Sequence, residues 1–209
     1  MRNHTTVSDL QQSVFHLKPE DTNGTLFVYA ASILPTSRLV NTSCEVCGCV
    51  SEIPEGSFDV VVEGGRQFPD LLYCGAYPFL IVSARVVDDW ERSNINDFSR
   101  FTVRVKDLTD AQVKLSDAPE YFRIEVRGSC EVDLRCSGLA LRKQCNSCGR
   151  RRLKQIAEKA YVLKTRSHKG SGLFRDSILP RVIFCSSTVS DLATANYHSN
   201  VKLQGVQLI

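Results

Sequence analysis

The chain has 209 residues, a formal net charge of +3 at pH 7 and a hydrophobic content of 43%. These values are ordinary for a globular protein, and the chain is long enough to bury a substantial core as one large or two small domains. No apolar run is long enough to span a membrane, and the polar stretch 1–12 lacks the hydrophobic centre of a secretory signal. We therefore expect a cytoplasmic protein with no membrane partner.

The first hundred residues alternate apolar runs with turn residues. We expect residues 1–25 to be a loosely ordered start. The apolar stretch 26–34 predicts a strand or a short helix, and the β-branched run 58–63 predicts a strand. A short apolar run over 79–82 then leads into a helix that we expect over residues 83–92.

The middle of the chain carries patterns typical of half-buried strands. Residues 101–105 and 121–127 alternate apolar and polar side chains, which predicts one strand in each stretch. A further strand-like stretch follows at 130–134. Residues 139–141 predict a strand that leads directly into a cysteine motif, as in a zinc ribbon.

The last third of the chain begins with an ambiguous segment. Residues 153–163 fit either a helix or a strand, because their periodicity does not decide between them. Residues 164–172 form a polar, glycine-containing loop, the best candidate for mobility. A strand over 182–185, a helix over 186–197 and a closing strand over 201–209 complete the predicted elements.

Two segments, 78–105 and 180–208, share the order apolar strand, serine, short helix, polar turn and strand. Two explanations fit this similarity equally well: the segments are two similar βαβ-type units, or short α/β segments look alike by chance. The patterns together predict an α+β fold with mixed or antiparallel sheets, short helices and a zinc-ribbon-like four-cysteine module. We divide it into a zinc-knuckle domain over 26–163 and a C-terminal strand–helix–strand unit over 164–209 packed on it.

Two Cys-x-x-Cys-Gly motifs, which we call knuckles, are the most informative feature of the sequence. They are Cys44-Glu45-Val46-Cys47-Gly48 and Cys145-Asn146-Ser147-Cys148-Gly149. Each supplies two thiolates on a tight turn, and the glycine lets the backbone bend so that N–H groups point at the sulfurs. A closed set of four thiolates is the usual structural zinc site. We therefore predict one zinc ion bound by Cys44, Cys47, Cys145 and Cys148, which requires a folded insert between the two knuckles.

The chain contains nine cysteines. Without a secretory signal this number fits a reducing compartment, in which metal binding is favoured over disulfides. Two unrelated turns with free thiols are the alternative to a zinc site, and Cys49 lies close enough to the first knuckle to be an alternative ligand. Buried or half-buried thiols are expected at the positions outside the knuckles, which are Cys49, Cys74, Cys130, Cys136 and Cys185.

Six basic residues flank the second knuckle, namely Arg142, Lys143, Arg150, Arg151, Arg152 and Lys154. Zinc ribbons sometimes present such an edge to phosphate, which makes a nucleic-acid-binding or regulatory protein the alternative function. We favour a solvated face that tunes the thiolates electrostatically, because no aromatic residues are interleaved with the basic ones as a stacking platform would need. A nucleic-acid partner is therefore not expected.

No constellation typical of an enzyme is apparent in the sequence, so we expect no catalytic activity. The four histidines lie at positions 4, 16, 168 and 198 without metal or triad spacing, and no Gly-x-Ser-x-Gly motif occurs. Asp88 and Asp89 are adjacent on a predicted helix, so they do not face each other as a general acid–base pair. We expect His168 to be solvated, Trp90 to lie in the core, and Arg175 to pair with a carboxylate in a structural role.

The order of several landmarks resembles a known family. Besides the knuckles, these landmarks are Tyr77-Pro78-Phe79 before the helix at Ser83, Tyr121-Phe122-Arg123-Ile124, Val132-Asp133-Leu134, Gly172-Leu173-Phe174-Arg175, Val182-Ile183-Phe184 and Gly205-Val206. From about residue 26 to its end, the chain resembles the bacterial double-CXXCG motif family, known from myxobacterial swarming-inhibition immunity proteins. It also looks like related immunity families of polymorphic toxin systems.

The resemblance implies a small cytoplasmic immunity protein that protects its producer by binding a cognate toxin domain. One departure from the family pattern concerns the residues inside the knuckles. Many members carry proline there, whereas this chain has Glu45-Val46 and Asn146-Ser147. The departure leaves the four cysteine ligands in place.

Overall fold

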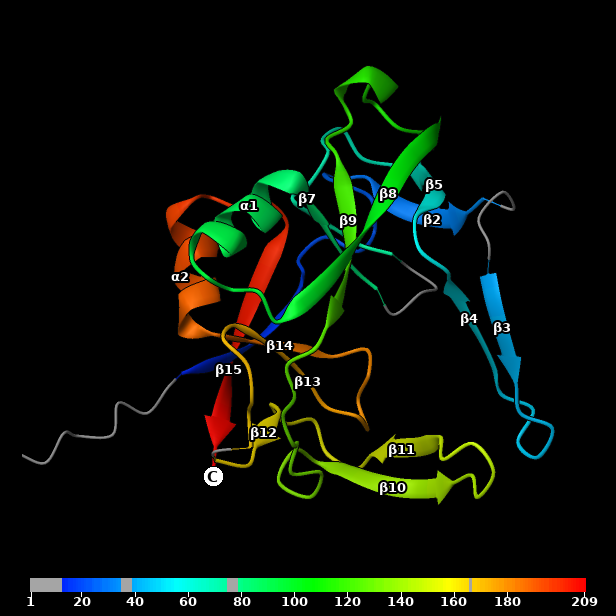
Figure 1. The fold of residues 1–209 in the computed structure, drawn as a ribbon, viewed down its shortest axis with the longest axis vertical. Helices are drawn as coiled ribbons and strands as arrows, with labels where there is room; N and C mark the ends of the chain where they lie inside the picture. Colours follow the sequence, from blue (N-terminus) through cyan, green and yellow to red (C-terminus); the bar gives the residue numbers. More distant parts are fainter. Residues whose placement is uncertain (1–12, 35–38, 75–78, 166) are drawn as a thin grey trace, which may run out of the picture.

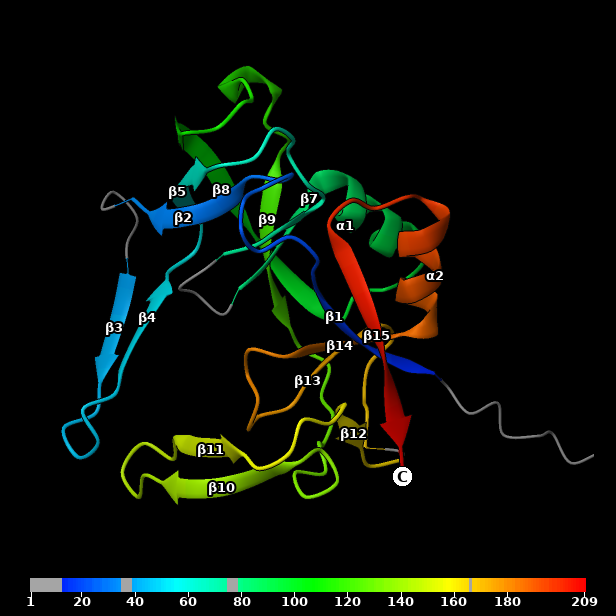
Figure 2. The same ribbon diagram turned by 180° about the vertical axis from the view of Figure 1, so that it is seen from behind.

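A computed structural model describes residues 13–34, 39–74, 79–165 and 167–209. Strands dominate this part of the chain, and two short helices lie side by side along one flank (Figures 1 and 2). Two long hairpins project from the opposite side. The expected mixed sheets and short helices are therefore present, with a larger share of strand than the α+β prediction implies.

The larger sheet has six strands, and its strands come from the first two thirds of the chain. Their spatial order is β2 (Tyr29–Ile33), β5 (Phe58–Glu63), β8 (Phe98–Thr109), β9 (Tyr121–Val126), β7 (Leu80–Ser83) and β6 (Leu71–Leu72). The β5–β8 pair is parallel and the other pairs are antiparallel. A short 3₁₀ helix, η1 (Leu115–Asp117), lies between β8 and β9.

The smaller sheet has five strands and joins the start of the described chain to its end. The spatial order is β12 (Val162–Leu163), β15 (Val201–Leu208), β1 (Val14–Pro19), β14 (Ile183–Ser186) and β13 (Leu173–Arg175). The β12–β15 pair is parallel. Because β1 is the central strand, the C-terminal strand–helix–strand segment packs against the beginning of the chain.

Each helix connects two strands that flank one antiparallel strand. Helix α1 (Ala84–Arg92) joins β7 to β8 around β9, and α2 (Ser187–Ala195) joins β14 to β15 around β1. Both helices begin after a serine in extended conformation, and each is followed within five residues by a residue with positive φ. The two sequence segments with the same predicted order of elements thus also have the same arrangement of strand, helix and strand in the structure.

The main hydrophobic core lies between the helices and the two sheets. Helix α1 contributes Val86, Val87 and Trp90, whose spacing puts them on one helical face, and α2 contributes Val189. Strands of both sheets complete this cluster. Trp90 is 2% exposed, which confirms its predicted place in the core.

Buried polar contacts join the two helical units along a seam beside this core. Asp70, just before β6, accepts hydrogen bonds from Ser83 Oγ (2.7 Å) and from the backbone N–H of Ser199 (2.8 Å), and it pairs with Arg85. Asn200 Nδ2 donates to the carbonyl oxygen of Leu71 (2.8 Å). These contacts link β6 and α1 to the turn after α2.

Several predicted elements differ from the structure. In contrast to the loose order expected for residues 1–25, Val14–Pro19 is a central strand, while residues 1–12 lie outside the described residues. Residues 130–134 form no strand; Val132 makes an isolated bridge to Leu163, and its N–H is bound by the Asp176 carboxylate. The ambiguous segment 153–163 divides into the end of β11 (Arg151–Gln155), an irregular stretch and β12.

Gly128 provides a test of how tightly this irregular region packs. A Cβ added at Gly128 would lie 1.9 Å from the carbonyl oxygen of Leu173 and 2.9 Å from Asp97 Oδ2. We expect Gly128→Ala to lower the free energy of unfolding by about 2–4 kcal/mol, because the nearest atom belongs to the backbone and cannot rotate away. Gly205→Ala is the matched control, since its Cβ would meet nothing within 4 Å. Equal stability of the two variants in urea denaturation would contradict this packing.

Candidate metal centre

Each knuckle forms the tip of a separate two-stranded hairpin. The first hairpin consists of β3 (Leu39–Ser43) and β4 (Val50–Pro54), and the second of β10 (Leu139–Gln144) and β11. The two tips have the same hydrogen bonds: Gly48 N–H donates to Cys44 O (2.8 Å), and Gly149 N–H donates to Cys145 O (2.9 Å). Both glycines have positive φ, 64° and 69°, a conformation that glycine adopts without steric cost.

The two hairpin tips meet, and their four sulfurs form one group. Cys44 Sγ lies 3.7 Å from Cys145 Sγ, and Cys47 Sγ lies 3.7 Å from Cys148 Sγ. All four sulfurs lie within 4.8 Å of one another. The cysteines selected from the sequence are thus brought together from two distant parts of the chain (Figure 1).

This geometry fits a tetrahedral metal ion better than disulfides. A tetrahedron with metal–sulfur bonds of about 2.3 Å has sulfur–sulfur edges of about 3.8 Å. The closest pairs across the two knuckles, at 3.7 Å, match that edge. A disulfide would require about 2.05 Å between sulfurs, and all nine cysteines are free thiols.

Backbone N–H groups surround the sulfurs in the same way in both knuckles. The N–H groups of Cys47 and then Val46 hydrogen-bond to the Cys44 thiol and lower its pKa to about 6. In the second knuckle, the N–H groups of Cys148 and then Ser147 lower the pKa of the Cys145 thiol. These N–H contacts favour the thiolate, the form that binds metal, at Cys44 and Cys145. At Cys47 and Cys148, one backbone N–H contact each lowers the pKa, but burial and hydrogen bonds with the neighbouring thiols outweigh that contact and raise the pKa.

Neither hairpin pairs with a further strand in the described part of the chain. Each is an isolated two-stranded sheet there, and no residue of β10 or β11 is buried. An isolated two-stranded hairpin is marginally stable in water. A metal ion held by both tips would therefore stabilise both hairpins by tying each to the other.

Cys49 lies next to the group but outside it. Its Sγ is 3.9 Å from Arg152 Nη2, and that contact lowers the pKa of the Cys49 thiol. Among the other cysteines expected to be buried or half-buried, Cys136 is exposed, because it lies in the turn that follows Asp133. Burial raises the pKa of the Cys130 and Cys185 thiols to about 12.

The expected basic edge lies on the β10–β11 hairpin, directly beside the cysteine group. All six side chains are exposed, namely Arg142, Lys143, Arg150, Arg151, Arg152 and Lys154. Lys143 lies directly opposite Arg152 across the hairpin. Within the described residues none of the six forms an ion pair.

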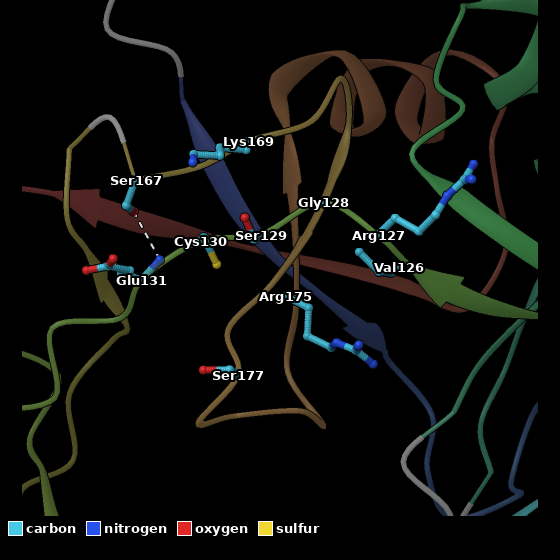
Figure 3. A pocket seen from close by; sticks show the side chains of 10 residues that line it. All are labelled: Val126, Arg127, Gly128, Ser129, Cys130, Glu131, Ser167, Lys169, Arg175 and Ser177. Atoms are coloured by element: carbon cyan, nitrogen blue, oxygen red, sulfur yellow. Dashed lines mark hydrogen bonds between the residues drawn. The ribbon is translucent and has the colours of Figure 1, made fainter.

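A pocket of about 340 Å³ lies elsewhere, between residues 126–131, 167–169 and 175–177. Three cationic side chains line it, but they diverge: Lys169 points away from Arg127 and Arg175 (Figure 3). Arg127 Nη2 donates to the carbonyl oxygens of Asn96 and Phe98, each at 2.7 Å. The ion pair expected at Arg175 is absent from the described residues. The pocket therefore has no convergent set of groups for a ligand.

The sequence did not predict the contact between Asp89 and His198, and it predicted the wrong environment for His168. Asp89 is buried, and its Oδ2 lies within hydrogen-bond distance of His198 Nε2, at 2.7 Å. Asp88 is exposed. The two aspartates therefore do not face each other, as predicted. His168 is half-buried and packs edge-on against Phe174 at 5.3 Å between ring centroids, so the expectation of a solvated ring is wrong.

No protein-family model matches the chain, and no curated protein matches it. No helix in the described ranges is long and apolar enough to cross a membrane.

Proposed function

We propose that this protein is an immunity protein that binds and neutralises a cognate bacterial toxin domain, with zinc in the four-cysteine site as its scaffold. The observation that carries the proposal is the meeting of Cys44 and Cys47 with Cys145 and Cys148 in one group of sulfurs. The two knuckles, with the Leu173-Phe174-Arg175 element, are also the most specific parts of the resemblance to the double-CXXCG family. Their union supports treating them as one functional unit.

A scaffold role follows from the chemistry of the site. Four sulfurs complete a tetrahedral zinc ion and leave no open position at which a substrate or water could bind. Zinc would add bonds between the two hairpins, and the β10–β11 hairpin has no buried residue of its own strands. The protein would then act through its surface, by stoichiometric binding that occludes the toxin's active site, and not as an enzyme.

Co-expression with the product of the neighbouring gene tests this function. We expect wild-type protein to restore growth of cells that express that product, and the two purified proteins to form a one-to-one complex. Cys145→Ser is expected to abolish or strongly reduce rescue, because the hairpins lose their common anchor. Failure of the wild-type protein to rescue growth would refute the immunity proposal.

The exposed basic edge supports a second candidate, a zinc-ribbon protein that binds nucleic acid. Lys143 and Arg152 lie opposite each other, and such cations can neutralise adjacent phosphates. This candidate requires binding to DNA or RNA that weakens steeply as salt rises. Absent or salt-insensitive binding of an oligonucleotide would exclude it.

A further inference from the structure

The β10–β11 hairpin has two chemically different faces. The register pairs Leu141 with Leu153, and Leu139 lies two residues before Leu141 on the same face. The opposite face carries Lys143, paired with Arg152, and the next cation on that strand, Lys154. A bulge at residue 142 keeps Lys143 opposite Arg152. By the same alternation the leucine face also carries Gln155, opposite Leu139, and Arg151 near the tip.

The leucine face is partly open to solvent. Leu141 is 48% exposed, and Leu139 and Leu153 are partly exposed. None of the three belongs to the three hydrophobic clusters of the body or packs against them. Two further apolar side chains are exposed, Ile156 directly after β11 and Val46 in the first knuckle, at 60% and 72%. An apolar patch bordered by polar residues is typical of an interaction surface.

The charged face has no carboxylate partner in the described part of the chain, although Arg152 contacts Cys49 Sγ at 3.9 Å. Like charges placed directly opposite each other destabilise a hairpin, and Lys143 and Arg152 are such a pair. No carboxylate of the described residues forms an ion pair with either side chain. An acidic partner would relieve this repulsion.

We propose that the β10–β11 hairpin is the docking surface for the toxin domain, and that it takes an apolar patch bordered by Asp and Glu side chains. This inference rests on the proposed immunity function. A protein partner explains both faces of the hairpin, because apolar contacts supply affinity and complementary charge supplies orientation and association rate. Nucleic acid would use the cations alone, and residues 139–155 contain no aromatic side chain on which a base could stack.

The test uses the full-length, metal-loaded protein and the purified product of the neighbouring gene. Leu141→Ser combined with Leu153→Ser removes most of the apolar face, and Lys143→Gln combined with Arg152→Gln removes the paired charges. We expect the leucine substitutions to raise the Kd for the toxin domain about tenfold or more. We expect the charge substitutions to lower the association rate constant, with the largest effect at low salt. Metal content should stay at the wild-type value in the leucine variant, and it is measured in the charge variant as well, because Arg152 contacts Cys49 Sγ beside the four-cysteine group.

The controls match the substitutions at distant sites. Leu115→Ser changes a leucine that is 42% exposed on η1, and Lys106→Gln changes an exposed lysine on β8. Both controls should bind like the wild type. If wild-type protein binds and the leucine variant binds equally well, the docking inference is overturned while the immunity function stands.

Other occupants of the surface give different results. If wild-type protein fails to bind the neighbouring product, both the immunity function and the docking inference fail. Binding of a single-stranded oligonucleotide that only the charge variant loses would assign the hairpin to nucleic acid. If light scattering shows a dimer that only the leucine substitutions disrupt, the hairpin binds a second copy of this chain. Either result overturns the inference.

Discussion

Cys145→Ser is expected to reduce bound zinc from one ion per chain to a small fraction of that value. Its sulfur lies 3.7 Å from Cys44 Sγ across the junction, so the substitution removes one of the four ligands and one bridge between the hairpins. Structural zinc sites contribute about 10–16 kcal/mol of apparent binding free energy in small zinc domains, and that energy is coupled to folding. The loss of zinc-binding free energy should therefore be among the largest effects that a single substitution in this chain can cause.

The effect should be local, because the body has its own hydrophobic clusters. Hydrogen exchange should quicken over residues 39–54 and 139–155, while the strands of the two main sheets keep their protection. Cys136→Ser is the matched control, since Cys136 is an exposed thiol outside the group. Unchanged zinc content in Cys145→Ser would contradict the four-ligand site.

Asp70→Asn is expected to lower the free energy of unfolding by about 2–3 kcal/mol at pH 7. The Asp70 side chain is 10% exposed, and its two oxygens accept hydrogen bonds from Ser83, Arg85 and Ser199. An amide would place N–H groups against at least one of these donors and would remove the charge that faces Arg85. Asp88→Asn, at an exposed position on α1, is the control and should change stability by less than about 0.5 kcal/mol.

The same variant has a defined pH dependence. Hydrogen bonds from Arg85, Ser199 and Ser83 outweigh burial and lower the pKa of Asp70 from 3.8 to about 2. A lowered pKa in the folded state contributes stability above pH 3.8 that is lost as the pH falls through about 2. The stability difference between wild type and Asp70→Asn should therefore be constant above about pH 5 and shrink toward pH 2. A difference that does not change over this range would show that the carboxylate charge is not what stabilises the seam.

Local patterns in the sequence predicted several elements because those elements are locally encoded. The β-branched run at residues 58–63 is β5, and the apolar spacing of Val86, Val87 and Trp90 is the inner face of α1. The knuckles were predictable for the same reason, since a Cys-x-x-Cys-Gly turn depends on a few adjacent residues. The union of their four sulfurs was required by the usual chemistry of zinc.

Long-range pairing was harder to predict. β1 is central to its sheet because it pairs with β14 and β15, which lie at the other end of the chain, and its own short sequence carries no sign of them. Residues 130–134 look like a strand, but the Asp176 carboxylate binds the N–H of Val132, so a regular ladder does not form there. Likewise, the contact between Asp89 and His198 depends on α1 meeting the turn that follows α2.

The most direct test of the four-cysteine zinc site is a zinc-edge X-ray absorption spectrum of the purified full-length protein, with metal content measured on the same sample. We expect one zinc ion per chain with four sulfur neighbours at about 2.3 Å. That result would establish the junction between the two knuckles as a closed structural site. A protein without metal, or a zinc ion with oxygen or nitrogen in place of any of the four sulfurs, would contradict it.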